Sequence, residues 1–74
     1  MKDQLLKTFS TFKTNLRQTR LLLCLTQKQV AEKIGITHQS YQAYESGVAL
    51  PTLENFLKLC RFFDLTPNEL LGID

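Results

Sequence analysis

The stretch that most constrains this chain is Thr26–Gly47, TQKQVAEKIGITHQSYQAYESG, which is typical of two short helices joined by a tight turn. Thr26 is a favourable N-cap residue, and Gln29 three positions later completes a capping box. Gly35 stands where a helix often ends with a left-handed residue. The apolar residues between these two ends fall on one helical face: Val30, Ala31 and Ile34.

A second helix follows directly after the glycine turn. Thr37 can cap this helix, its apolar positions are Tyr41 and Tyr44, and Gly47 ends it. The small side chain of Ala31, four residues before the turn glycine, allows two helices to approach closely at a steep angle. These features together predict a helix-turn-helix.

The residues before the motif predict a long first helix from about Leu5 or Thr8 to Leu23. Its apolar residues recur at helical spacing on one face: Leu5, Phe9, Phe12, Leu16 and Leu23. Cys24 follows at the end of this helix, where proteins with a similar helix-turn-helix usually have glycine. A residue with a Cβ is strained in the left-handed conformation that such a glycine adopts. We therefore expect mild strain or an altered helix end at Cys24.

Two more helices are predicted after the motif. Thr52 caps a helix over Leu53–Phe63. The run Thr66–Glu69 combines a capping box with Pro at the first helical position, which starts a short helix over Pro67–Leu71. Five helices without a strand pattern predict an all-α single domain over residues 1–74.

The chain resembles the Cro/lambda-repressor-type regulators, the xenobiotic-response-element family. The similarity lies in the motif and in L-R-Q-T-R ahead of L-T-Q, in Y-E-S-G, and in P-T-L-E-N-F-L-K-L-C-R-F-F-D-L-T-P-N-E-L-L-G. It extends over most of the chain, from Phe12 to Gly72. It implies a five-helix, lambda-repressor-like DNA-binding domain without a cofactor. The implied function is that of a transcriptional repressor, which binds a palindromic site in double-stranded DNA as a homodimer.

The resemblance places base contacts on the third helix, residues 38–46. If Thr37 caps this helix, four residues share the face opposite the tyrosines: His38, Gln39, Gln42 and Ala43. A glutamine can form two hydrogen bonds with adenine N6 and N7, and the Ala43 methyl can contact a thymine methyl. An ordinary solvated helix face is the alternative interpretation of these four residues.

Contacts to the DNA backbone are expected at the start of the second helix. Gln27 lies close to unpaired N–H groups that favour phosphate, and the resemblance assigns it a backbone contact. Lys28 is a weaker candidate for the same role. The third helix holds no Lys or Arg, so phosphate neutralisation must come from elsewhere, with Arg17 and Lys13 as further candidates.

The resemblance also pairs Glu45, in the last turn of the third helix, with Arg20 of the first helix. The negative end of a helix disfavours a carboxylate, so an unpaired Glu45 would be costly. We therefore expect Arg20 and Glu45 to form a partly buried, hydrogen-bonded ion pair.

Apolar residues outside the predicted core indicate two contact surfaces. The fifth helix is too short to bury all of its apolar residues, which makes the C-terminus the expected dimer contact: Leu70, Leu71 and Ile73. Leu21 and Leu22 stand where the family usually has charged residues, and they indicate a surface for a partner protein. With the uncharged link Val48–Leu50, they favour the alternative function, a protein-interaction module that kept the fold but binds DNA weakly or not at all.

Composition narrows the remaining classes of function. Charged residues make up 22% of the chain; residues 1–25 carry a net charge of +4 and residues 26–74 a net charge of −2. One histidine and two cysteines, Cys24 and Cys60, show no catalytic or metal-binding pattern, so we expect neither an enzyme nor a metal site. There is no apolar run of about 18 residues and no signal-peptide pattern in MKDQLLKTF. We therefore expect no membrane association, and a cytoplasmic protein with reduced thiols.

Overall fold

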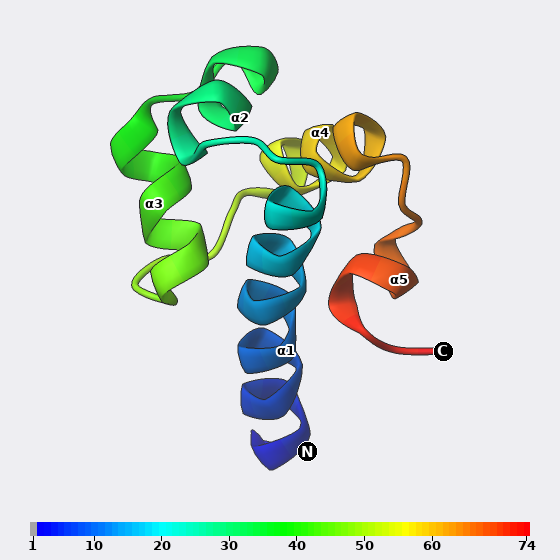
Figure 1. Ribbon diagram of the computed structural model, residues 1–74. Helices are drawn as coiled ribbons and strands as arrows, with labels where there is room; N and C mark the ends of the chain where they lie inside the picture. Colours follow the sequence, from blue (N-terminus) through cyan, green and yellow to red (C-terminus); the bar gives the residue numbers. More distant parts are fainter. Residues whose placement is uncertain (1) are drawn as a thin grey trace.

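The computed structural model describes residues 2–74, which form five helices and no strand (Figure 1). The helices are, in chain order, α1 (Lys2–Leu22), α2 (Gln27–Ile34), α3 (His38–Ser46), α4 (Leu53–Phe63) and α5 (Pro67–Leu71). α1 is the long axis; α3 lies on one side of it, α5 on the other, and α4 near its C-terminal end (Figure 1). The predicted all-α, five-helix architecture is confirmed. None of these five helices is long and apolar enough to cross a lipid bilayer.

Local capping chemistry sets where α2 to α5 begin. Each N-cap side chain accepts a hydrogen bond from the backbone N–H three residues later: Thr26, Thr37, Thr52 and Thr66. These bonds satisfy donors that a helix leaves unpaired in its first turn. The predicted bounds of these four helices are confirmed.

The end of α1 is held by a cysteine in an unusual conformation. Cys24 has φ 57°, in the left-handed region that favours glycine. Its N–H bonds to the Leu21 carbonyl at 3.0 Å, and the Leu25 N–H bonds to the Arg20 carbonyl at 3.2 Å. This is the hydrogen-bond pattern of a Schellman helix end. The expected strain at Cys24 is confirmed, because a side chain costs about 1–2 kcal/mol in this conformation.

The core fills the angle between α1 and the other four helices. Its buried apolar residues are Phe12, Leu16, Val30, Ala31, Ile34, Tyr41, Tyr44, Leu59, Cys60, Phe63 and Leu70. α5 docks on α1 through the Asn15 side-chain amide, which donates to the Leu70 carbonyl at 3.2 Å.

The prediction that Leu70 contributes to a dimer contact is wrong. Its side chain is 0% exposed, because the docking of α5 on α1 turns Leu70 into the core. Leu71 is half-buried at the edge of the core, and Ile73 is exposed. A dimer contact at Leu71 and Ile73 stays a prediction.

α1 begins earlier than predicted, at Lys2, and its first turns project beyond α3 and α5 (Figure 1). No side chain from residue 3 to residue 11 is buried. Leu5 and Phe9, which helical spacing placed on the same face as the buried residues of α1, are therefore exposed, and so is Leu23 at the far end. On that face only Phe12 and Leu16 are buried, because neighbouring helices cover them.

Candidate nucleic-acid interface

The turn between α2 and α3 is fixed by hydrogen bonds around its glycine. Gly35 has φ 78°, and the N–H groups of Gly35 and Ile36 both bond to the Ala31 carbonyl at 3.0 Å. Thr37 then caps α3: its Oγ1 accepts from the Ser40 N–H at 3.1 Å and donates to Ser40 Oγ at 2.8 Å. The turn therefore sets the direction in which α3 leaves α2.

α3 presents one face to the core and another to solvent. Tyr41 and Tyr44 are buried, and the Tyr44 hydroxyl accepts a hydrogen bond from Asn55 Nδ2 at 3.0 Å, which ties α3 to α4. The four predicted base-contact residues lie outside this core, the first three exposed and the last half-buried: His38, Gln39, Gln42 and Ala43. The exposed face thus offers side-chain amides, whose paired donor and acceptor suit the edge of a base.

A buried ion pair holds α3 against α1. Arg20 Nε donates to Glu45 Oε2 at 2.6 Å, and Arg20 Nη2 donates to Glu45 Oε1 at 3.0 Å. Arg20 Nη1 also donates to the Leu25 carbonyl at 2.8 Å, just beyond the end of α1. The guanidinium is therefore fully oriented, in the two-pronged geometry that makes arginine–carboxylate pairs strong.

α2 joins the same network through Gln27. Its Nε2 donates to Glu45 Oε1 at 3.1 Å, so a single carboxylate connects α1, α2 and α3. Burial opposes ionisation of Glu45, but the hydrogen bonds from Arg20 and Gln27 outweigh it and lower the pKa of the carboxyl below 4.5. The hydrogen bond to Glu45 raises the pKa of the Arg20 guanidinium. The pair is charged at neutral pH.

The Tyr41 hydroxyl adds a buried polar group beside this pair. The side chain is fully buried, and the hydroxyl has no hydrogen-bond partner within residues 2–74. Burial, followed by the neighbouring Glu45 carboxylate, raises the pKa of this hydroxyl far above its usual value. The Tyr41 hydroxyl is therefore enclosed in the core, whereas the Tyr44 hydroxyl bonds to Asn55.

Comparison with known proteins agrees with this geometry. Residues 16–70 match the model of a helix-turn-helix family of the Cro/C1 type, which is more than half of the chain. The chain belongs to this helix-turn-helix family. The predicted resemblance is confirmed.

Three curated relatives are similar to this helix-turn-helix protein over most of its length. The cryptic phage CTXphi transcriptional repressor RstR of Vibrio cholerae is 42% identical over 60 residues, which cover 81% of the chain and 54% of RstR. The uncharacterized HTH-type transcriptional regulator YobD of Bacillus subtilis is 41% identical over 58 residues, which cover 78% of the chain and 52% of YobD. The HTH-type transcriptional activator BcrR of Enterococcus faecalis is 35% identical over 61 residues, which cover 82% of the chain and 30% of BcrR.

The chain spans about half the length of the first two of these relatives. No solved structure gives a significant match.

The predicted phosphate-contact residues of this helix-turn-helix protein are differently placed. Arg17 and Lys28 are exposed, whereas Lys13 is half-buried and its side chain lies over Gly47 at the end of α3. Gln27 is half-buried, and its amide is directed to Glu45. The groups at the start of α2 that can bind a phosphate are therefore mainly the first-turn N–H groups and the exposed Lys28.

Sequence reasoning missed two polar contacts of this site. One is the bond from Gln27 to Glu45, and the other is the bond from Asn55 to the Tyr44 hydroxyl. Both contacts join residues from different helices, so no local sequence pattern predicts them. Within residues 2–74 there is no group of three His, Cys, Asp or Glu side chains that could hold a metal ion.

Proposed function

We propose that this helix-turn-helix protein is a sequence-specific transcriptional repressor that binds double-stranded DNA. It reads the major groove with α3 and acts as a homodimer on a palindromic site. The proposal rests on the exposed face of α3, which presents the side-chain amides of Gln39 and Gln42. A buried ion pair to α1 holds this face in place. RstR, which is named a repressor, is more similar to the chain than BcrR, which is named an activator.

Each element of the motif has a separate role in this proposal. His38, Gln39, Gln42 and Ala43 contact base edges, and the two glutamines supply the hydrogen bonds that discriminate between bases. Gln27 and Lys28 place the start of α2 against a phosphate, which fixes the register of α3. Arg17 adds a charge contact to the backbone from the exposed face of α1.

The second candidate function is a protein-interaction module with weak DNA binding or none. The distribution of charge favours it: neither α3 nor residues 47–52 contain Lys or Arg. Leu21 and Leu22 on α1 are 52% and 83% exposed, and they would form the contact with a partner protein.

Selection from a random pool of double-stranded DNA distinguishes the two candidates. The repressor proposal predicts an enriched inverted repeat, with half-site centres about 34–36 Å apart. A variant with Leu22→Lys should enrich the same sequence, because Leu22 is exposed on α1 and is not among the residues proposed to contact bases. If no sequence is enriched even at low salt, the interaction-module function replaces the proposal.

A further inference from the structure

The N-terminal turns of α1 are an exposed helix with an apolar side. No side chain from residue 3 to 11 is buried, and Leu6 is 60% exposed. This segment precedes residues 16–70, which match the family model. These turns belong to the 21-residue helix α1, whose later turns are packed in the core at Phe12 and Leu16. Leu5, Leu6 and Phe9 together form an exposed apolar surface at the free end of α1.

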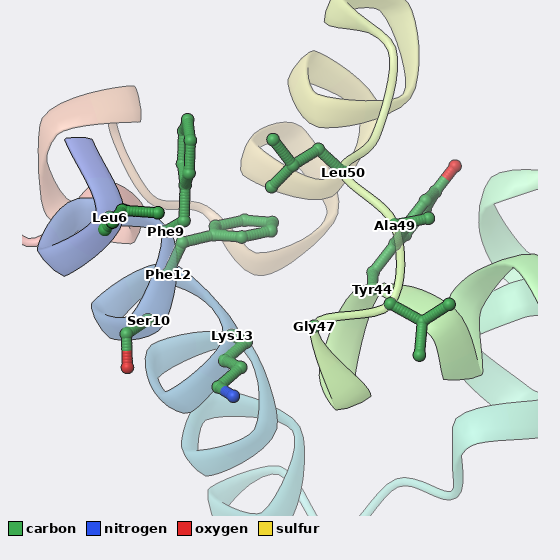
Figure 2. A pocket seen from close by; sticks show the side chains of 10 residues that line it. Leu6, Phe9, Ser10, Phe12, Lys13, Tyr44, Gly47, Ala49 and Leu50 are labelled. Carbon is green, nitrogen blue, oxygen red and sulfur yellow. The ribbon is translucent and has the colours of Figure 1, made fainter. Parts of the chain in front are cut away.

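A groove runs beside this segment. It has a volume of about 510 Å³ and lies between α1 and the link that follows α3 (Figure 2). On the α1 side it is lined by Leu6, Phe9, Ser10 and Lys13, and on the other side by residues 47–50. Lys13 is the one charged residue among those that line it. An adjoining apolar hollow of about 290 Å³ contains Phe9 and Leu50 and extends the groove toward α4.

Charge on α1 indicates what fills the groove. Asp3, Leu6, Ser10 and Lys13 follow one another at steps of three, four and three residues, so they form one stripe along the helix. Asp3 stands at one end of this stripe and Lys13 at the other. Neither residue makes a salt bridge to another side chain of residues 3–74, the part of the chain whose side chains are described. The stripe is therefore self-complementary when it meets a second stripe running in the opposite direction.

We propose that a second copy of this chain occupies the groove, with the N-terminal turns of the two α1 helices packed antiparallel about a two-fold axis. In this arrangement Asp3 of each copy opposes Lys13 of the other, and Leu6 opposes Ser10. The small serine leaves room for the leucine, and two-fold symmetry makes each contact twice. We prefer this surface to the predicted C-terminal dimer contact, which loses Leu70 to the core.

This inference rests on the proposed function for its consequence, a dimer that spans two half-sites, but its test needs no DNA. Sedimentation equilibrium on the 74-residue chain should give a reversible dimer between micromolar and submillimolar concentration. Leu6→Lys should weaken the dimer at least about tenfold, because a charge replaces a buried leucine at each of two contacts. The matched control is Leu22→Lys on the same helix, which should leave association unchanged.

A charge exchange tests the antiparallel register itself. Asp3→Lys and Lys13→Asp should each weaken the dimer by about five- to tenfold, since each creates like charges at two symmetric contacts. The double variant with both changes should return to within about twofold of the wild-type dimer. Asp3 is exposed in the first turn, so its replacement leaves the fold intact; circular dichroism checks this for both residues.

Three results would overturn the inference: a wild-type chain that is monomeric throughout, a double variant that stays weak, or equal loss of dimer in Leu6→Lys and Leu22→Lys. A monomeric chain that still selects a DNA sequence refutes this inference and leaves DNA binding standing. A dimer with the expected charge response that selects no DNA refutes the proposed function and leaves this inference standing.

Discussion

Gln27 Nε2 donates to Glu45 Oε1 at 3.1 Å, so the first residue of α2 is joined to the last turn of α3. The same carboxylate receives two hydrogen bonds from Arg20 on α1. One buried acid therefore holds the two helices of the motif in their relative positions. This makes the ion pair important both for the stability of the fold and for the geometry of the proposed DNA contacts.

Removing this carboxylate should destabilise the protein substantially. Glu45→Ala leaves the buried Arg20 guanidinium without its partner, and we expect the free energy of unfolding to fall by about 1–3 kcal/mol. The matched control is Glu54→Ala, which removes a surface carboxylate 3.9 Å from Lys58. That change should cost less than about 0.5 kcal/mol. Urea denaturation measures both, and equal effects would contradict the assigned role of Glu45.

The contribution of Glu45 should depend on pH in a defined direction. Its pKa in the folded state is lowered below the usual 4.5, so its stabilising effect is complete above that value. The effect is lost as the pH falls through the lower pKa of the folded state, because the pair must then be broken by protonation. The difference in stability between wild type and Glu45→Ala should therefore shrink from pH 7 to about pH 3. A difference that stays constant over this range would show that the charge of Glu45 contributes little.

Cys24 should be replaceable by glycine with a gain in stability. The left-handed conformation at φ 57° strains a residue with a Cβ. Cys24→Gly should raise the free energy of unfolding by up to about 1 kcal/mol, after the greater freedom of glycine in the unfolded chain is subtracted. Cys24→Ala is the control: it removes the thiol but keeps the Cβ, so it should give no gain. Thermal unfolding of the two variants decides whether conformation or the thiol sets the effect.

Two glutamines of the motif should affect DNA binding in different ways. Gln39→Ala should relax discrimination at one or two base pairs by about 1–3 kcal/mol each, because Gln39 is exposed on α3 and makes no contact that the fold needs. Gln27→Ala should weaken binding to all sequences alike, and should also reduce stability through the lost bond to Glu45. Selection from random DNA with each variant measures the difference; identical motifs for wild type and Gln39→Ala would contradict the assignment.

Local signals predicted much of this fold from the sequence. The starts of α2 to α5 followed from threonine caps, and the ends of α2 and α3 followed from glycines, because both signals act within a few residues. The start of α1 was misplaced because the sequence before Leu5 holds no comparable cap.

Which apolar residues are buried depended on contacts between distant helices. Periodicity showed that Phe9 and Leu16 share a face of α1, but only the packed structure shows that neighbours cover Leu16 alone. Leu70 was assigned to the surface by the shortness of α5, yet its position against α1 buries it. The link between Gln27 and Glu45 likewise needed the relative placement of two helices.

The proposed repressor binds DNA specifically as a dimer that makes few phosphate contacts. α3 and the following link supply no cation, and the proposed dimer contact engages Lys13, so Arg17 and Lys28 remain as the contributors in each protomer. If both reach the backbone, log affinity should fall against log salt with a slope of about −4 for a dimer.

The most direct measurement is fluorescence anisotropy of the wild-type chain on a selected palindromic site and on a scrambled site, over a series of salt concentrations. A dimeric, sequence-specific repressor should bind the selected site more tightly than the scrambled site at every salt concentration, with a slope of about −4. Binding should be detectable only when both half-sites are present. Equal affinity for the two sites, or no binding to either at low salt, would contradict the proposed function.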